Sequence, residues 1–529
     1  MGDLEGADVL IVGAGPVGAV AADRLVGAGL DVICLEQGGA PGPLVPPASA
    51  PWELLGAGTS HFSPNRRGAA GDYPIDDTDS DIEVLVWNGI GGGTVLWGAQ
   101  WERYLPSDFR VRSLDGVAED WPIGFEDLAP YYDRLDLDFG AAATPGDPAF
   151  PANGAAPYPA LPIMDLGRRM AEAHNRLGRH WWPGPNVVGP VENMERARRE
   201  GYPAGMRARA GETHWTRAQK AGARLVTGAH VRRILLSAPD RAEGVEWIDE
   251  HGKPRRTLAD VVVLSAGGIG TPRLLLASAT REHPDGLANS SGLVGRNLML
   301  HPFTRVVGLF DEPFDGVQGY WGQLLHCLEY AETDTSRGFL RGAKWNLGQG
   351  FGPVAAALYP GHREQLWGPA LAEHVRGWVG RSGIWGITVD DLPDEENRIE
   401  LHPQRTDRWG TPVPVVRYRT PQDAARALLY NVERATESFR EAGAHTVLTT
   451  PSLRGFGWHQ LGSARMGRDA ARSVVGPDGR AHDVPNLLIL DASTFVTGSS
   501  LNPTATVCAV ALRAAEALLS SASDRKVAP

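Results

Sequence analysis

The chain has 529 residues, too many for one ordinary hydrophobic core, so we expect two domains or one domain with a large appended layer. Its 63 acidic and 51 basic residues give a formal net charge of −12. That balance, with no lysine or arginine run, argues against a nucleic-acid partner. Three widely separated cysteines, Cys34, Cys327 and Cys508, predict no disulfide framework and suit a reducing compartment.

The N-terminus leads from Met1 almost directly into an apolar run, which leaves no room for a signal peptide. No uninterrupted apolar run approaches the ~20 residues needed to cross a membrane. We therefore expect a cytoplasmic protein with no membrane partner.

A glycine motif follows directly on residues 9–12, an apolar run typical of a buried parallel strand. Gly13 permits the tight turn out of the strand, and Gly15 lets a pyrophosphate approach the backbone because it has no side chain. Gly18 lets the next helix pack closely on the sheet. The N-terminus of that helix offers unpaired N–H groups to the phosphates.

A second apolar run, residues 32–35, ends in Glu36, where a carboxylate can accept hydrogen bonds from both ribose hydroxyls. Such a carboxylate argues against a ribose that carries a 2′-phosphate. The alternative is a purely structural βαβ turn, because glycine-rich turns are common. Strand, glycines, helix, strand and acid together favour dinucleotide binding, but the motif alone does not separate FAD from NAD.

A second glycine cluster, Gly91-Gly92-Gly93 followed by Thr94, lies beyond a long Pro/Gly/Asp-rich loop at 38–81. Three consecutive glycines indicate that the backbone comes very close to something flat or large. The alternative is a bulged strand end.

The middle of the chain again has patterns typical of helices and strands. Helical patterns cover 118–138, with Pro130 at the start of a second helix, and 164–177, whereas 140–162 and 184–211 have no clear pattern. Strands are expected at 223–227 and 231–236, then a hairpin of 244–248 with 255–258, then a buried strand at 259–264. A helix is expected to start at Thr271-Pro272.

From 301 to 447 the chain is dense in aromatic residues, including Tyr320, Trp321, Trp345 and Trp385. Alternating strands at 397–403 and 414–419 and an amphipathic helix ending at Gly443 predict a second domain with an antiparallel sheet. Aromatic side chains on a sheet suit stacking on a sugar ring, but a tryptophan in such a place is more often a core residue.

The C-terminal part places polar residues at the ends of elements. His459 precedes a Gly-rich turn, Asp491 ends a strand that begins at 486, and Asn502 opens a helix at 505–519. Functional groups on α/β folds project from such ends. The alternative is a purely structural role, with His459 as a core histidine and Asn502 as a helix N-cap before Pro503.

The chain resembles the glucose–methanol–choline (GMC) flavoprotein oxidoreductases over nearly its whole length. The more specific motifs are Gly91 to Thr94, Val294 to Leu298 followed by His301-Pro302, His459 to Gly467, and Asp491 to Ser493 leading to Asn502-Pro503-Thr504. Two positions depart from a common family signature, which has a small residue other than Gly at Gly268 and has Gly at Ala279.

The resemblance implies FAD as the cofactor and an α/β fold. It implies a Rossmann-like FAD-binding domain made of 1–115, 220–300 and 455–529. Residues 116–219 and 301–454 then form a substrate domain on a mixed or antiparallel sheet, with lid segments.

By the same resemblance, the ADP part of FAD is held by Gly13, Gly15, Gly18 and Glu36, with the main chain near Val231 at the adenine. The flavin is lined by Gly92, Gly93, Thr94 and Ala99. The ribityl chain and ring are lined by Asp491, Ala492, Asn502, Pro503 and Thr504. His459 matches the catalytic histidine, and Asn502 the family's His-or-Asn position. Because an amide cannot act as a base, proton abstraction falls on His459 alone.

Some members of the family attach FAD through a histidine of a GGMSTHW-like motif, at the place where this chain has Leu96. Leucine cannot form that bond, so we expect dissociable FAD.

The resemblance predicts oxidation of an alcohol to a carbonyl on a sugar, glycoside or cyclic polyol. The alternatives are a non-sugar alcohol, a lyase with redox-silent FAD on the same fold, and a flavin-bearing binding protein. The electron acceptor, O₂ or another molecule, and the oligomeric state stay open. No metal site is expected, because His326 and Cys327 are adjacent and have no ligand partners nearby in the sequence.

Overall fold

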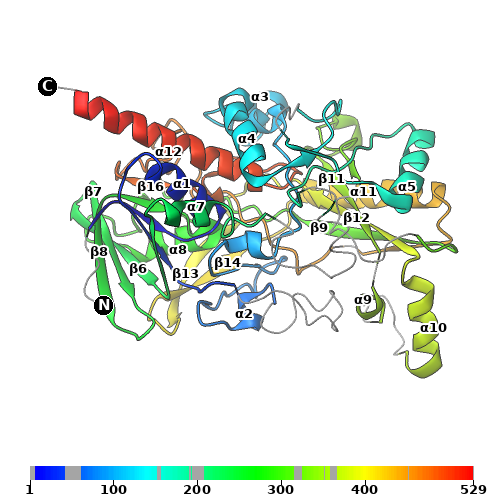
Figure 1. Ribbon diagram of the computed structural model, residues 1–529, viewed down its shortest axis with the longest axis horizontal. Coiled ribbons are helices and arrows are strands. Elements are labelled where there is room, and N and C mark those ends of the chain that lie inside the picture. The colour runs from blue at the N-terminus through cyan, green and yellow to red at the C-terminus, as the bar shows by residue number, and fades with distance from the viewer. Residues whose placement is uncertain are drawn as a thin grey trace.

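The computed structural model describes residues 6–41, 61–151, 156–189, 192, 208–314, 325–350, 352–357, 366–450 and 452–527. Residues 42–60 of the loop at 38–81, and most of 190–207 in the patternless stretch 184–211, lie outside this range. Figure 1 shows two sheets side by side along the long axis, with the helix α12 running across the first of them.

The first sheet has seven described strands in the order β5–β2–β1–β8–β7–β6, with β16 also paired to β8. β1 is parallel to β2 and β8, as the continuous apolar runs predict. The predicted α/β fold class is therefore confirmed. The strands are β1 (Ala7–Val12), β2 (Val32–Glu36), β5 (Arg224–Thr227), β6 (His230–Ala238), β7 (Arg241–Ile248), β8 (Pro254–Leu264) and β16 (Leu487–Ile489).

Strand β8 belongs to two ladders at once. Its first half, 254–258, is antiparallel to β7, and its second half, 259–264, is parallel to β1. The two segments expected at 255–258 and 259–264 are therefore one strand. Because β8 is continuous, it joins the β6–β7 hairpin to the parallel strands. A second link comes from Ala229, just before β6, whose N–H donates to the carbonyl of Glu36 at the end of β2 at 3.0 Å.

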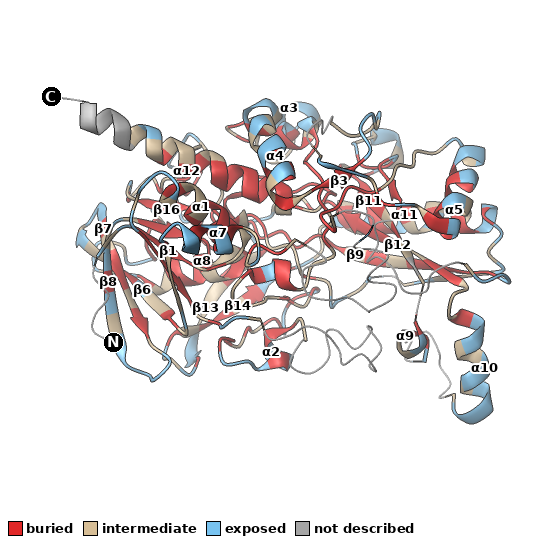
Figure 2. Cartoon of the chain, viewed as in Figure 1, coloured by how far each residue is buried: buried red, intermediate tan, exposed pale blue. Residues whose placement is uncertain are grey.

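The helices that lie with this sheet are α1 (Pro16–Val26), α4 (Phe125–Phe139), α7 (His214–Lys220), α8 (Gly267–Ala277) and α12 (Thr504–Val527). Of these, α1 contacts β1 and β2, α8 contacts β6, and α7 packs on α1. α12 packs on α1 and α4. Its segment 504–521 is long and apolar enough to cross a membrane, but 61% of it is buried inside the protein (Figure 2), as in the core helix of a globular protein.

Two predicted helix starts are wrong. Pro130 lies inside α4 and Pro272 inside α8. Each helix begins earlier because a carboxylate satisfies its first N–H groups: Asp127 accepts from Gly124 N at 2.8 Å, and Asp491 accepts from Gly267 N at 2.9 Å.

The second sheet is antiparallel in the order β10–β11–β12–β9–β15, as the expected substrate domain requires. Its strands are β9 (Phe303–Leu309), β10 (His326–Cys327), β11 (Ala343–Gln349), β12 (Ser382–Val389) and β15 (Thr446–Thr449). α11 (Gln422–Glu441) packs on the sheet, and α5 (Met164–Leu177), predicted at these residues, packs on α11.

Two tryptophans of the second sheet belong to the core. Trp345 and Trp385 are fully buried and donate from Nε1 to Asn431 and Ser438 of α11. The core alternative is therefore right for both tryptophans. Tyr320 and Trp321 lie outside the described residues.

The hairpin of β13 (Arg398–Thr406) and β14 (Pro412–Arg417) is placed differently from the prediction. Its strands pair only with each other among the described strands, and they pack on α8. Ile399 and Val416 share a small core with Tyr73 and Leu298. This hairpin thus lies with the first sheet, although the sequence put it in the second domain. The other limits of the two domains stay predictions.

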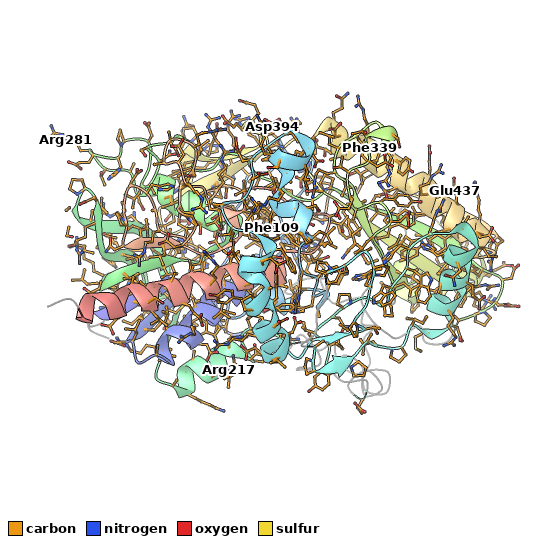
Figure 3. The ribbon with its side chains drawn as sticks, turned by 90° about the horizontal axis from the view of Figure 1, so that it is seen from above. Phe109, Arg217, Arg281, Phe339, Asp394 and Glu437 are labelled. Carbon is orange, nitrogen blue, oxygen red and sulfur yellow. The ribbon has the colours of Figure 1, made fainter. Side chains whose placement is uncertain are left out.

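Short elements complete the described chain. In Figure 3, Phe109 lies near the middle of the molecule, where its ring meets Trp121 edge-to-face at 5.1 Å. The short elements are α2 (Pro64–Arg67), η3 (Gly92–Val95), η4 (Pro106–Phe109), α3 (Val111–Asp115), β3 (Ala142–Ala143), β4 (Tyr158–Pro159), η5 (Thr335–Arg337), α9 (Pro353–Ala357), α10 (Gly368–Trp378) and η6 (Ala492–Thr494).

Candidate active site

The first glycine motif has the geometry that its residue types imply. Gly13 has φ +104°, and a Cβ there would lie 2.5 Å from the Ser265 carbonyl oxygen. A Cβ at Gly18 would lie 2.2 Å from the Gly13 oxygen. Both positions therefore require glycine, Gly13 for the turn and Gly18 for close packing of α1 on β1.

The second glycine cluster lies against the first. Gly91 N donates to the Ala14 carbonyl at 2.9 Å, and a Cβ on Gly92, at φ +52°, would lie 2.8 Å from the Gly15 Cα. Residues 92–95 form the 3₁₀ helix η3 and not a bulged strand end. Thr94 Oγ1 closes this turn by donating to Gly91 O at 2.6 Å.

Glu36 is held at the end of β2 by two backbone groups. Ala14 N donates to its Oε2 at 2.8 Å and Gly38 N to its Oε1 at 2.9 Å. Burial raises the pKa of Glu36, while these N–H groups act in the opposite direction. Each carboxylate oxygen keeps a lone pair for a ligand hydroxyl.

A cavity of about 710 Å³ joins the predicted segments. Its size is that of a ligand site, roughly 300–1,000 Å³. Gly18 and Ala99 are absent from its lining, since Gly18 serves packing and Ala99 is buried with its carbonyl bonded to Val187 N at 2.9 Å. The other predicted residues line it: Gly13, Gly15, Glu36, Gly92, Gly93, Thr94, Val231, His459, Asp491, Ala492, Asn502, Pro503 and Thr504.

Asp491 has a structural task in this wall. Its carboxylate accepts hydrogen bonds from Gly267 N at 2.9 Å, Thr271 Oγ1 at 2.5 Å and Ser493 N at 3.0 Å. Burial raises the pKa of Asp491, although these donors favour the ionised form. The residue ties the start of α8 to η6 and so shapes the cavity.

The departure at Gly268 has a local reason. A Cβ at this position would lie 2.3 Å from the Gln460 carbonyl oxygen. Glycine therefore lets the start of α8 touch the backbone next to His459.

His459 and Asn502 meet on the cavity wall. His459 Nε2 lies 3.3 Å from Asn502 Nδ2, and its Nδ1 lies 3.0 Å from His301 Nδ1. Burial, and then the positive charge of Lys344, lower the pKa of His459 to about 3. The imidazole is therefore neutral at physiological pH and has a nitrogen free to accept a proton.

Lys344 is a residue that sequence reasoning missed. It is fully buried on β11 and donates from Nζ to Gln100 Oε1 at 2.5 Å, Glu102 Oε1 at 2.6 Å and Asn502 Oδ1 at 2.5 Å. Its one local signal is a lysine inside a strand otherwise made of apolar and neutral polar residues. Its partners are remote in sequence, so no spacing pattern exposes the cluster.

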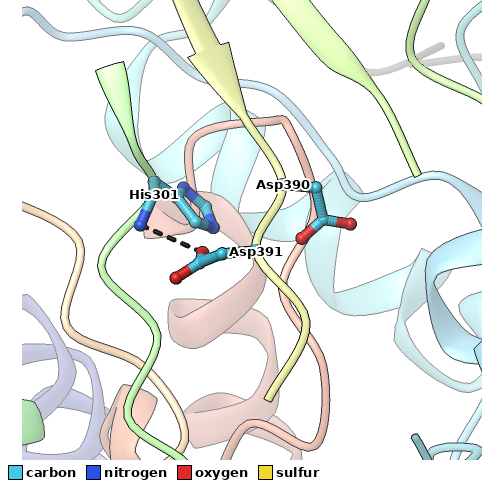
Figure 4. A group of neighbouring side chains, drawn as sticks. All are labelled: His301, Asp390 and Asp391. Atoms are coloured by element: carbon cyan, nitrogen blue, oxygen red, sulfur yellow. Dashed lines mark hydrogen bonds between the residues drawn. The ribbon is translucent and has the colours of Figure 1, made fainter. Parts of the chain in front are cut away.

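His301, Asp390 and Asp391 lie together near the site (Figure 4). The Asp391 carboxylate accepts from Leu300 N and His301 N at 2.8 and 3.0 Å and from Tyr418 Oη at 2.6 Å. Burial raises the pKa of Asp391 to about 6.

Asp390 accepts from Arg341 Nε at 2.8 Å, and Arg341 also pairs with Asp108. A guanidinium thus supplies the positive charge that a metal ion would supply. We therefore interpret the group of His301, Asp390 and Asp391 as a structural one.

The geometry of the site defines a class of protein. A parallel sheet, a glycine turn and a buried acid form one end of the cavity, and a neutral histidine beside an amide forms the other. This is a dinucleotide-binding fold with a site for proton transfer at its far end.

Comparison with known proteins agrees with this class. Residues 191–303 and 393–511 match the N- and C-terminal models of the GMC oxidoreductases. The chain is 37% identical to a 2-methyl-1,2-propanediol dehydrogenase of Mycolicibacterium austroafricanum, over 98% of this chain and 96% of that protein. It is 28% identical to the fructose dehydrogenase large subunit of Gluconobacter japonicus, over 97% and 98%.

A solved structure, pyridoxine 4-oxidase from Mesorbium loti, superposes with a TM-score of 0.68 at 19% identity, covering 97% of this chain and 99% of that one. This likeness shows the fold alone. The chain belongs to the GMC oxidoreductase family and is an FAD-dependent alcohol oxidoreductase. The lyase alternative has no support among these relatives.

The residues present fit FAD. Glu36 offers free lone pairs at one end of the cavity. The backbones of Gly15 and Gly92 lie so close together that a Cβ on Gly92 would clash, and neither residue has a side chain that would keep a ligand away. A Cβ on Gly93 would meet nothing within 4 Å, so open space remains beside the backbone of η3.

Proposed function

We propose that the protein oxidises a CH–OH group of a polyhydroxylated small molecule, a sugar or other cyclic polyol. The observation that carries the proposal is the pair His459–Asn502 on the wall of the cavity that also contains Glu36 and Gly15. When bound, FAD supplies the two-electron acceptor for this oxidation.

The chain's own residues handle the proton and the substrate oxygen. His459 Nε2 accepts the hydroxyl proton, since this nitrogen is unprotonated before the reaction. The Asn502 amide donates to the same oxygen and holds the alcohol in place.

Strands of the second sheet form the substrate end of the cavity with every second side chain. Alternate residues of each strand face it, and the intervening ones, such as Trp345 and Trp385, face α11. Polar and aromatic groups together suit a ring with hydroxyls. The lining residues are Phe303 and Arg305 of β9, Asn346 and Gly348 of β11, and Ile384, Gly386 and Thr388 of β12.

Two further aromatic side chains line the same cavity. Phe456 stacks on Phe303 at 4.4 Å with an interplanar angle of 7°, and Trp458 meets Phe62 edge-to-face at 4.4 Å. Flat apolar faces next to Arg305, Asn346 and Thr388 favour a cyclic polyol.

A short aliphatic diol is the second candidate substrate. It is favoured by the relative named for 2-methyl-1,2-propanediol, at 37% identity. Both candidates carry neighbouring hydroxyls, but they differ in ring, in size and in whether the oxidised hydroxyl is on a ring carbon.

An anaerobic substrate screen tests the proposal. Sugars, cyclic polyols and aliphatic diols are mixed with the FAD-loaded enzyme, and absorbance near the flavin band is followed. We expect bleaching with a cyclic polyol, and no bleaching by any alcohol would contradict the proposal. Air is then admitted, because rapid return of colour identifies O₂ as the acceptor and slow return points to another one.

Our remaining expectations belong to the same proposal. FAD is bound without a covalent link, the protein is cytoplasmic, and it has no nucleic-acid or membrane partner. Leu96 at the attachment position supports the first, and the net charge of −12 argues against nucleic acid.

A further inference from the structure

Lys344 lies directly behind the proposed catalytic pair. Its ammonium group is fully buried and bonded to Asn502 Oδ1 at 2.5 Å. We propose that Lys344 is a positioning residue, which turns the Asn502 amide N–H toward the cavity and thereby sets the tautomer in which His459 Nε2 is free to act as base. The inference rests on the proposed function and names a residue that the family motifs do not contain.

The ammonium group decides which way the Asn502 amide points. An ammonium is a donor only, so it faces the amide oxygen and never the amide nitrogen. Asn502 Nδ2 is therefore left on the side of His459 Nε2, 3.3 Å away. Without the lysine, a simple flip of the amide would exchange the two atoms.

The amide then decides the tautomer of His459. Because Asn502 Nδ2 is a donor, the His459 Nε2 that faces it is the acceptor, and the ring hydrogen lies on Nδ1. This N–H points at His301 Nδ1, 3.0 Å away, which must accept it. His301 then carries its own hydrogen on Nε2. The ammonium group of Lys344 thus fixes the tautomer of both imidazole rings.

Electrostatics support the same arrangement. The groups that face His459 are Lys344 and His301, and the positive charge of Lys344 opposes protonation of either ring. Glu102 accepts from the ammonium at 2.6 Å, and His326 Nδ1 lies 3.4 Å from the same carboxylate oxygen. The buried pair of Lys344 and Glu102 is neutral as a whole, which makes its burial tolerable.

The test removes the pair without leaving a buried charge. Lys344→Met alone would strand Glu102, so the main variant is Lys344→Met with Glu102→Gln. We expect it to bind FAD but to reduce flavin about 10²-fold more slowly with the substrate found above, because the amide is no longer held.

The pH profile separates positioning from mere structure. In the wild-type enzyme His459 is neutral throughout, so flavin reduction should be flat from pH 5 to 8. Loss of the Lys344 charge removes the second of the two causes that lower the pKa of His459, so any loss of activity toward acid pH should begin at a higher pH in the double variant than in the wild type. A wild-type rate with a flat profile would overturn the proposal.

Arg103→Met with Asp136→Asn is the matched control. It removes another buried ion pair, with Nη2–Oδ2 at 2.6 Å, whose members do not line the cavity. We expect a lower melting temperature but an unchanged rate of flavin reduction and an unchanged profile. Equal loss in the control and in the double variant would also refute the positioning role.

A measurement on the wild-type protein does not depend on the double variant. With ¹⁵N-labelled histidine rings, and His459→Ala to assign the signal, we expect His459 protonated on Nδ1 and bare on Nε2. An Nε2–H tautomer would overturn the proposal. If His459→Ala itself leaves flavin reduction intact, the proposed function fails. If it abolishes reduction while the double variant behaves as wild type, only the role of Lys344 fails.

Discussion

His459 and His301 face each other through their Nδ1 atoms, 3.0 Å apart, so one of the two rings donates and the other accepts. The Nε2 of His301 is buried with no hydrogen-bond partner among the described residues. His459 alone presents its other nitrogen to the cavity, beside Asn502. The two rings therefore have different positions: the imidazole of His459 faces the cavity, and the imidazole of His301 lies behind it.

His459→Ala should bind FAD normally and reduce it roughly 10²–10⁴-fold more slowly, because the base is lost. Stopped-flow absorbance under anaerobic conditions measures the rate. Reduction near the wild-type rate would remove His459 from the mechanism.

His301→Ala should slow flavin reduction by about 10²-fold, because the His459 ring loses the acceptor that orients it. His301→Asn is the matched variant. Its amide oxygen can occupy the place of Nδ1, and asparagine tolerates the φ of +50° at this position. We expect Asn to retain far more activity than Ala, and equal losses would argue against an orienting bond.

Gly93→Ala should fold like the wild type and lose FAD affinity. A Cβ there meets no protein atom within 4 Å, so the added methyl group can clash only with a ligand. Gly377→Ala in α10 is the control, because its Cβ is equally unhindered. Flavin content after gel filtration and melting temperature are measured together, and full flavin content in Gly93→Ala would exclude close contact with the cofactor.

Acid precipitation should release yellow flavin into the supernatant, since Leu96 cannot form a covalent bond to FAD. The pellet should be colourless. A yellow pellet would show a covalent link through another residue.

Asp407→Asn should lower the free energy of unfolding by about 2 kcal/mol at pH 7. Burial acts to raise the pKa of Asp407, but the hydrogen bond from His230 and the charge of Arg273 outweigh it and lower the pKa to about 2. A depressed carboxyl pKa contributes stability above its unfolded value of 3.8. That contribution disappears as the pH falls from about 4 to about 2.

Urea unfolding of both proteins at pH 7 and pH 3 checks this prediction. We expect the gap between wild type and Asp407→Asn to narrow at the lower pH. A gap that does not change with pH would mean that Asp407 acts through packing and not through its charge.

Much of the fold was predictable, since it rests on local patterns. The runs at 9–12 and 32–35 could be buried only as parallel strands around a glycine turn, and 164–177 formed the predicted helix. The errors came from tertiary partners. Asp491 started α8 before Pro272, and contact with α8 placed the β13–β14 hairpin beside the first sheet.

The sequence by itself predicted a dinucleotide site, because a glycine turn between two apolar strands has a local signature, and the family resemblance pointed to the histidine and the amide. Only the tertiary structure decided how these groups are arranged. It placed Lys344 of the second sheet behind Asn502, and His301 behind His459, across separations of 158 residues each. Hydrogen bonds between such distant residues leave no spacing pattern, yet they decide which nitrogen is free to act as base.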